Sequence, residues 1–267
     1  MEKLRSPKPL MRVQFFQSLP KGIIMKKKYF VTSDVHGFYT IFHNALLDAG
    51  WEENNPDHIL IICGDLFDRG QEAKELLNYL LSIPEERLIL IRGNHEDLME
   101  RCIDDLINND IEYYHITNGT FNTIEQLVGK DVPLNSPDEL RDSLSDYYRL
   151  VNRCKDYYEL GDYVFVHGWI PNLVCDSHGL LVTNKHGWEK ARWKNGMEEW
   201  SLGSLIEGKT IVCGHWHTSF GNYTYHNIGS GEFESDSSFE PFIDKGIVAL
   251  DSAIAYTHKC NIITLQI

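Results

Sequence analysis

The sequence predicts an α/β fold in which helices cover a mostly parallel sheet. Two internal runs, 59–63 and 88–91, are apolar throughout instead of alternating, which is typical of strands buried on both faces. Segments with apolar residues at helical spacing, 38–49 and 72–81, separate these runs from each other and from a first strand at 29–33. This strand–helix–strand–helix–strand order favours helices packed on both sides of a sheet.

Further β-rich runs lie at 163–166, 210–213, 246–250 and 262–266. The stretch between them and the first three strands has a helical pattern, and Ser136-Pro137 with Glu139 is a typical helix start. We therefore expect one domain over 25–267 with a helical insertion at about 97–160. Met25 is followed by three lysines and then the first strand, so we interpret 1–24 as an N-terminal extension outside the core.

Composition excludes several classes of protein. The 267 residues are 42% apolar and 24% charged, which is ordinary for a globular chain and excludes collagen-like and disordered sequences. A formal net charge of −14 argues against binding to a nucleic-acid duplex. No apolar run is long enough to span a membrane, and the six cysteines form no CxxC pair. We expect reduced thiols and a location in the cytoplasm.

Residues that carry chemistry follow five consecutive strands. They are Asp34 and His36; Asp65, Asp68 and Arg69; Arg92, Asn94 and His95; His167; and His215 and His217. Ligands of open α/β sheets bind beyond the carboxyl ends of the strands, so we expect these side chains to meet at one edge. Carboxylates with imidazoles suit manganese, iron or zinc. Seven of these residues are candidate ligands, too many for one ion but suited to two ions that lie about 3.5–4 Å apart and share one carboxylate. The predicted cofactor is two divalent ions, Mn²⁺ first, with Fe or Zn as alternatives.

The blocks in which these residues lie resemble a known family. The sequence reads Asp-Val-His-Gly at 34–37, Gly-Asp-Leu-Phe-Asp-Arg-Gly at 64–70, Gly-Asn-His-Glu at 93–96, His-Gly at 167–168 and Gly-His at 214–215. This pattern is similar to that of the calcineurin-like metallophosphoesterases, and Asp-Arg-Gly at 68–70 resembles the phosphoprotein phosphatase branch. The resemblance covers most of 29–217. It implies a four-layer α/β/β/α sandwich of two mixed sheets with a dinuclear site at one rim.

The resemblance also implies a role for each matching residue. Asp34 and His36 would hold the first ion and Asp65 would bridge both ions. The second ion would be held by Asn94, His167 and His215.

Two further pairs would act on the substrate. His95 would be the general acid that protonates the leaving oxygen, with Asp68 orienting its ring. Arg69 and Arg92 would bind the phosphate. The alternatives from the residues alone are that His95 only orients a neighbour and that Arg69 only stabilises its turn in a salt bridge.

The chain departs from the family pattern in three places. Ser33 stands where the family has glycine before the first ligand. The fifth block continues to a second histidine, and in the wider superfamily this spacing places His217 on the first ion. Some members carry a phosphate-binding arginine two residues after a tryptophan, whereas Trp193 is flanked by Arg192 and Lys194. Which of these two cations contacts the phosphate stays open.

The function that the resemblance implies is a dinuclear-metal phosphoesterase that hydrolyses phosphomonoesters by metal-activated water. The nearest substrate class is phosphoserine or phosphothreonine in proteins, as for a serine/threonine protein phosphatase. The alternative is a bis(5′-nucleosyl)-tetraphosphatase acting on diadenosine tetraphosphate, and a further one is a non-catalytic metal-binding module. The expected partners are a phosphorylated protein or a nucleotide polyphosphate, with no duplex and no membrane.

Overall fold

The structure is a computed structural model that describes residues 27–108, 112–129, 136–171, 174–175, 181–182 and 185–267. The predicted N-terminal extension, 1–24, lies outside these residues. None of the helices in the described ranges is long and apolar enough to cross a membrane.

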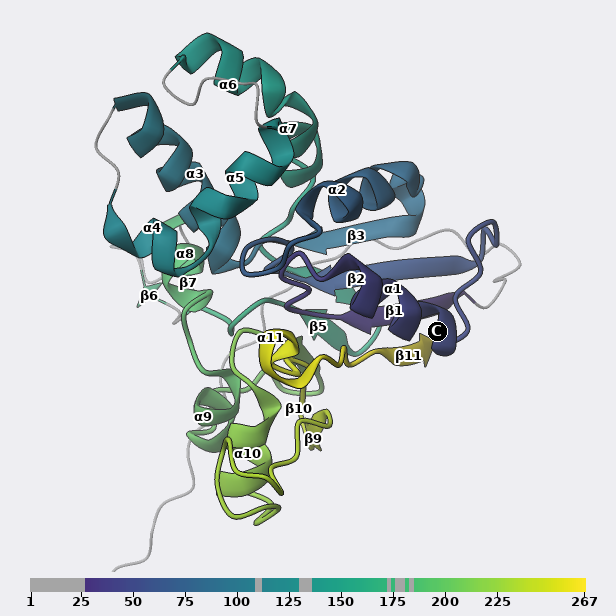
Figure 1. Ribbon diagram of the computed structural model, residues 1–267. Coiled ribbons are helices and arrows are strands. Elements are labelled where there is room, and N and C mark those ends of the chain that lie inside the picture. The colour runs from purple at the N-terminus through teal and green to yellow at the C-terminus, as the bar shows by residue number, and fades with distance from the viewer. Residues whose placement is uncertain (1–26, 109–111, 130–135, 172–173, 176–180, 183–184) are drawn as a thin grey trace, which may run out of the picture.

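Two mixed sheets form the centre of the chain (Figure 1). The first has the order β11-β1-β2-β3, with strands Ile263–Gln266, Lys28–Thr32, His58–Cys63 and Leu88–Ile91. The second has the order β4-β5-β8-β10-β9, with strands Tyr158–Leu160, Tyr163–Phe165, Thr210–Cys213, Ile247–Ala249 and Phe242–Asp244. In each sheet the inner strands run parallel and the antiparallel strands lie at edges. A two-stranded ribbon, β6 (Val174–Cys175) with β7 (Leu181–Val182), is separate.

The two sheets pack face to face, which explains why their strands are apolar on both sides. Val31, Ile61 and Cys63 of the first sheet share a buried cluster with Phe165 and Val212 of the second. The alternate residues of the first sheet face outward and pack beneath α1 (Tyr39–Asp48) and α2 (Ala73–Ser82). Removing such side chains from water stabilises each by about 1.5–3 kcal/mol, so both faces of the sheet are mostly apolar.

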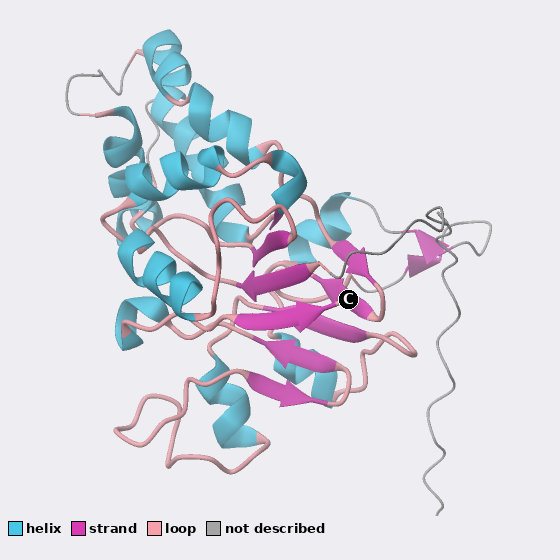
Figure 2. Cartoon of the chain, turned by 90° about the vertical axis from the view of Figure 1, so that its right-hand side faces the viewer, coloured by secondary structure: helices cyan, strands magenta, loops and turns pink. Residues whose placement is uncertain are grey.

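The second sheet is covered on its outer face in the same way. Val164, Ile211 and Ile247 pack with Met197 of α9 (Gly196–Ser201), and Phe220 of α10 (Thr218–Thr224) lies against this cluster. Figure 2 shows the strands together in the middle of the chain with helices around them. Helices, sheet, sheet and helices form four layers, so the predicted α/β/β/α sandwich is confirmed.

Among the described residues, five helices lie between β3 and the second sheet. They are α3 (Asn94–Asn108), α4 (Tyr113–Thr117), α5 (Thr120–Val128), α6 (Pro137–Ser143) and α7 (Ser145–Val151), and they gather beyond α2 in Figure 1. α3 begins inside the predicted site and α5 returns toward the turn at 68–70. The remaining short helices are η1 (Glu85–Arg87), α8 (Lys185–Ala191) and α11 (Ile254–Thr257). That these elements form one domain with an insertion stays a prediction.

Candidate active site

The predicted site residues lie where the parallel strands of both sheets end. Strands β1, β2 and β3 run in one direction, as do β5, β8 and β10, so their carboxyl ends form two adjacent edges. Most of the side chains that follow are buried: Asp34, His36, Asp65, Asp68, Asn94, His95 and His167. Polar side chains that are buried away from water require hydrogen-bond or ionic partners, so a concentration of them at one edge indicates a functional site.

The backbone at this edge is left-handed at six non-glycine residues. They are Asp34, His36, Asp65, Asp68, Arg69 and His215, with φ between 50° and 73°. Left-handed backbone is uncommon outside glycine, and such strain concentrates at functional sites. The turns that follow β1, β2 and β8 therefore hold their side chains in conformations that packing alone does not favour.

Two glycines are required because other groups approach them closely. A Cβ atom on Gly93 would collide with the carboxylate of Asp65, and one on Gly214 would collide with that of Asp34. These contacts supply the physical reason for glycine beside the site residues of the third and fifth blocks.

Asp65 lies between two groups of side chains that can hold ions. In one group the ligand atoms of His36, Asp65 and His95 lie within 4.8 Å of one another. In the other the same holds for Asp65, His167 and His215. Oδ2 of Asp65 lies 3.7 Å from Nε2 of His36, and Oδ1 lies 3.3 Å from Nε2 of His167. The two oxygens of one carboxylate thus face the two groups separately.

The remaining predicted ligands adjoin these groups. Oδ1 of Asp34 lies 4.0 Å from Nε2 of His36, and the backbone N–H of His215 donates to the same carboxylate at 3.0 Å. Oδ1 of Asn94 lies 2.8 Å from Nε2 of His167.

Backbone carbonyls fix the orientation of two rings. Nδ1 of His36 donates to the carbonyl of Phe67 at 2.9 Å, and Nδ1 of His167 donates to that of Cys63 at 2.8 Å. Their Nε2 atoms are therefore directed into the site, as in histidines that bind metals. Nε2 of His167 faces oxygens of both Asn94 and Asp65, an arrangement that requires a proton or a cation between them.

The pKa shifts of His167 and Asp65 also indicate that positive charge is favoured between these residues. Burial alone would lower the pKa of His167, but the carboxylates of Asp65 and Asp34 raise it to about 10. Burial would raise the pKa of Asp65, but the surrounding imidazoles hold it well below its usual range. Burial and the charge of His167 lower the pKa of His215 to about 3. The neutral ring of His215 is the form that binds a metal.

His95 forms a buried pair with Asp68. Nδ1 of His95 lies 2.7 Å from Oδ2 of Asp68, which also accepts a hydrogen bond of 2.7 Å from the hydroxyl of Thr120. Burial would lower the pKa of His95, but Asp65 and Asp68 outweigh it and raise that pKa. The ring is therefore oriented and favours its protonated form. Sequence reasoning missed Thr120, because α5 carries no motif.

The arginines differ in their surroundings. Arg69 is exposed and its Nη2 lies 3.4 Å from Nε2 of His95. Arg92 is held by Asp97 at 2.7 Å and by Glu100 at 2.6 Å. Arg69 is thus a cation beside His95, and phosphate contacts by Arg69 and Arg92 both stay predictions.

The two cations beside Trp193 are also paired. Arg192 is buried and binds Asp97 at 2.6 Å as well as Asp156. Lys194 lies 3.2 Å from Glu199. A phosphate contact by either one would require it to exchange these partners.

His217 lies outside both ion-binding groups. Its Nδ1 contacts the hydroxyl of Ser219 at 2.9 Å, and its Nε2 lies 3.2 Å from the carboxylate of Glu232. An ion at His217 would have to replace Glu232, so its role as a ligand stays a prediction.

Two buried carboxyl groups at this edge were not predicted. Glu96 accepts hydrogen bonds from the backbone N–H groups of Asp65, Leu66 and Gly93 at 2.7–3.0 Å. Asp251 follows β10, and burial raises its pKa. The position of Glu96 after the predicted general acid was a usable signal, but a single aspartate after β10 was not.

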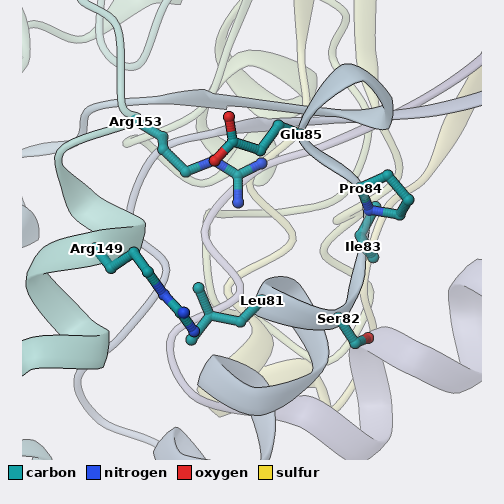
Figure 3. Close-up of a pocket in the computed structure, with 7 residues that line it drawn as sticks. All are labelled: Leu81, Ser82, Ile83, Pro84, Glu85, Arg149 and Arg153. Carbon is teal, nitrogen blue, oxygen red and sulfur yellow. The ribbon is translucent and has the colours of Figure 1, made fainter.

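A separate pocket lies at the other end of the first sheet, beside the turn that enters β3. Figure 3 shows its lining of Leu81, Ser82, Ile83, Pro84, Glu85, Arg149 and Arg153. It contains none of the predicted site residues.

Comparisons with known proteins identify a family and a fold for this chain. The sequence model of the calcineurin-like phosphoesterases matches residues 27–219. A symmetrical bis(5′-nucleosyl)-tetraphosphatase from Buchnera aphidicola is 37% identical over 68 residues, which are 26% of this chain and 23% of that protein. The match therefore spans about a quarter of the curated relative.

Solved structures support the fold. A mutant of a cold-active protein tyrosine phosphatase aligns with a TM-score of 0.51 and 16% identity over 90% of this chain and 75% of that one. A second structure of a cold-active protein tyrosine phosphatase aligns with a TM-score of 0.50 and 14% identity, covering 90% of this chain and 73% of that one. The chain belongs to the calcineurin-like phosphoesterase family.

Proposed function

We propose that the chain hydrolyses phosphomonoesters at a pair of divalent ions bridged by Asp65. The observation that carries this proposal is the placement of the two Asp65 oxygens against two separate histidine groups. Asp34 and His36 would hold one ion. The other would be held by Asn94, His167 and His215.

The residues present fit such ions. Buried carboxyl groups concentrate here, namely Asp34, Asp65, Asp68, Glu96 and Asp251. Asp68 is paired with His95 and Glu96 with backbone N–H groups. The charges of Asp34, Asp65 and Asp251, however, repel one another, and a bound cation would neutralise them. Imidazole, carboxylate and amide donors together favour manganese, with iron or zinc as alternatives.

The chain's own residues would move the proton and hold the substrate. When bound, two divalent ions lower the pKa of a water and neutralise phosphoryl oxygens. His95, oriented by Asp68, would give its Nε2 proton to the leaving oxygen. Arg69, next to His95, would bind the phosphate oxygens and fix the ester bond within reach of that proton.

For the substrate we propose phosphoserine or phosphothreonine in proteins, which rests on the Asp-Arg-Gly block at 68–70. A specific observation favours a second candidate, diadenosine tetraphosphate, because the curated relative that matches this chain carries that activity in its name.

The test is metal analysis followed by turnover of para-nitrophenyl phosphate with defined metals. We expect two ions per chain and activity that manganese restores after chelation. A phosphoserine peptide and diadenosine tetraphosphate, assayed side by side, then separate the two substrates. A protein that binds the ions after reconstitution but hydrolyses none of these substrates would instead be the non-catalytic metal-binding module.

A further inference from the structure

Large aromatic side chains are exposed on the side of the site formed by the second sheet. Trp216 is 37% exposed, Phe233 49% and Tyr256 57%. With Phe239 they form a cluster that we call the aromatic rim. Single exposed apolar residues are common, but a contiguous group beside a site marks a binding surface.

The rim is continuous with the proposed ion site. The ring centroid of Trp216 lies 6.2 Å from that of His215, and Trp216 stacks on His217 at 5.9 Å. The ring of Phe233 follows 4.5 Å from His217. Rings thus run outward from a proposed metal ligand to the rim.

The outer part of the rim is built from separate segments. The ring of Tyr256 lies 5.3 Å from that of Phe233 and 5.6 Å from that of Phe239. The side-chain amide of Asn261 donates to the carbonyl of Phe239 at 2.8 Å, which ties the loop after α10 to the chain beyond α11. The rim is therefore held in place before a ligand arrives, which lowers the cost of binding.

A carboxylate lies within this surface. Glu232 precedes Phe233 and contacts His217, and its side chain is 38% exposed. Flat rings offer stacking to any base, and a carboxylate accepts hydrogen bonds from the amino groups of bases. The ring of a tyrosine phosphate is one oxygen atom from the phosphorus, so it extends less far from a phosphate held at Asp65 than a base does. A base separated from its phosphate by a sugar suits a surface of this extent.

We propose that the aromatic rim stacks the base of a nucleoside polyphosphate whose phosphate occupies the Asp65 site. This inference rests on the proposed function and favours its second candidate. Trp216 is the ring of the rim nearest to His215 and Phe233 lies further out, so both determine specificity without taking part in the bond cleavage.

The test compares binding of ADP and pyrophosphate to the manganese-loaded protein by calorimetry. We expect ADP to bind about tenfold more tightly than pyrophosphate, because base–aromatic stacking supplies the difference. Trp216→Leu and Phe233→Leu should each reduce this preference severalfold, and Trp216→Phe should retain most of it. Tyr113→Leu removes an exposed aromatic residue of α4 outside the rim and is the matched control.

The outcomes separate the two levels of the proposal. If the protein hydrolyses glycerol phosphate but binds ADP and pyrophosphate equally well, the proposed base stacking on the aromatic rim would be wrong while the proposed function would stand. A preference for a tyrosine phosphate peptide over ADP would do the same. Absence of bound metal and of any hydrolysis would overturn the proposed function as well.

Discussion

The two sheets contribute unequal halves to the candidate site. In the half that follows β1, β2 and β3, buried hydrogen bonds hold the site residues in place. Glu96 accepts from the backbone N–H of Asp65, and the carbonyl of Phe67 orients His36. In the half that follows β5, β8 and β10, His167 is supported by Cys63, but beyond His215 the rings become exposed. The first half is closed and the second opens to solvent.

This difference assigns different tasks to the halves. Proton transfer and charge stabilisation need groups fixed in position, which the buried hydrogen bonds of the first half provide. Substrate recognition needs accessible surface, which the second half offers at Trp216 and Phe233. Substitutions of the catalytic residues in the first half should therefore reduce turnover, and those of the exposed rings in the second half should change binding.

The largest effect is expected for Asp65→Asn, which strikes the residue shared by both ion-binding groups. Several kcal/mol of transition-state stabilisation would be lost, so kcat/KM should fall by about 10³-fold or more. Both ions should leave together, as measured by elemental analysis of the purified protein. Retention of one ion at full occupancy would contradict a bridging role.

The next effect tests His95 without disturbing the ions. His95→Asn should lower kcat by roughly 10²–10⁴-fold for an alkyl phosphate while two ions remain bound. The loss should be smaller for para-nitrophenyl phosphate, whose leaving group needs no proton. An equal loss for both esters would remove His95 from the role of proton donor.

The third effect is a shift in the pH profile. His95 must be protonated to donate, and Asp65 and Asp68 raise its pKa above the usual 6.5 against the effect of burial, so activity should persist to higher pH before it declines. Asp68→Asn removes one of these charges and should move the alkaline limb of kcat to lower pH. An unchanged limb would assign that titration to another group.

A moderate effect on metal affinity is expected at Glu96, whose carboxylate holds the turn of Asp65 by hydrogen bonds. Glu96→Gln keeps one acceptor oxygen and replaces the other by an NH2 group, which cannot accept the backbone N–H bonds made to that position. Metal affinity should fall by about 10–100-fold, the usual consequence of losing a supporting hydrogen bond. Titration with manganese measures this loss, and Glu100→Gln, on the exposed side of the same helix, is the control.

The sequence predicted the first half more completely than the second. Runs such as 59–63 are apolar on both faces because they lie between a sheet and helices, so periodicity and composition sufficed to predict α/β layers. The fourth layer and the two-sheet detail needed the family resemblance. The structure brings Asp34, His36, Asp65, Asn94 and His95 to one edge because each follows a parallel strand directly.

Features that depend on distant segments left no local pattern. Thr120 reaches Asp68 only because α5 folds back over the turn, and Glu232 meets His217 from a loop 15 residues later in the chain. The aromatic rim joins three segments in the same way. Spacing rules describe neighbours along one strand or helix, and these contacts are set by how loops are packed.

The smallest effect tests Asp251, the unpredicted carboxyl group of the second half. It is buried, and together with burial its charge raises the pKa of Asp34, so the two groups repel each other when no cation is present. Oδ1 of Asp251 accepts a hydrogen bond of 2.8 Å from the backbone N–H of Ala253. Asp251→Asn keeps this acceptor oxygen and removes the charge. The melting temperature of the metal-free protein should therefore rise, while manganese affinity should fall a fewfold. Asp244→Asn, an exposed carboxyl group of β9, should change neither quantity. Because a purely structural role would lower the stability of both forms, opposite signs in the metal-free and metal-loaded protein identify Asp251 as part of the charge that holds the ions.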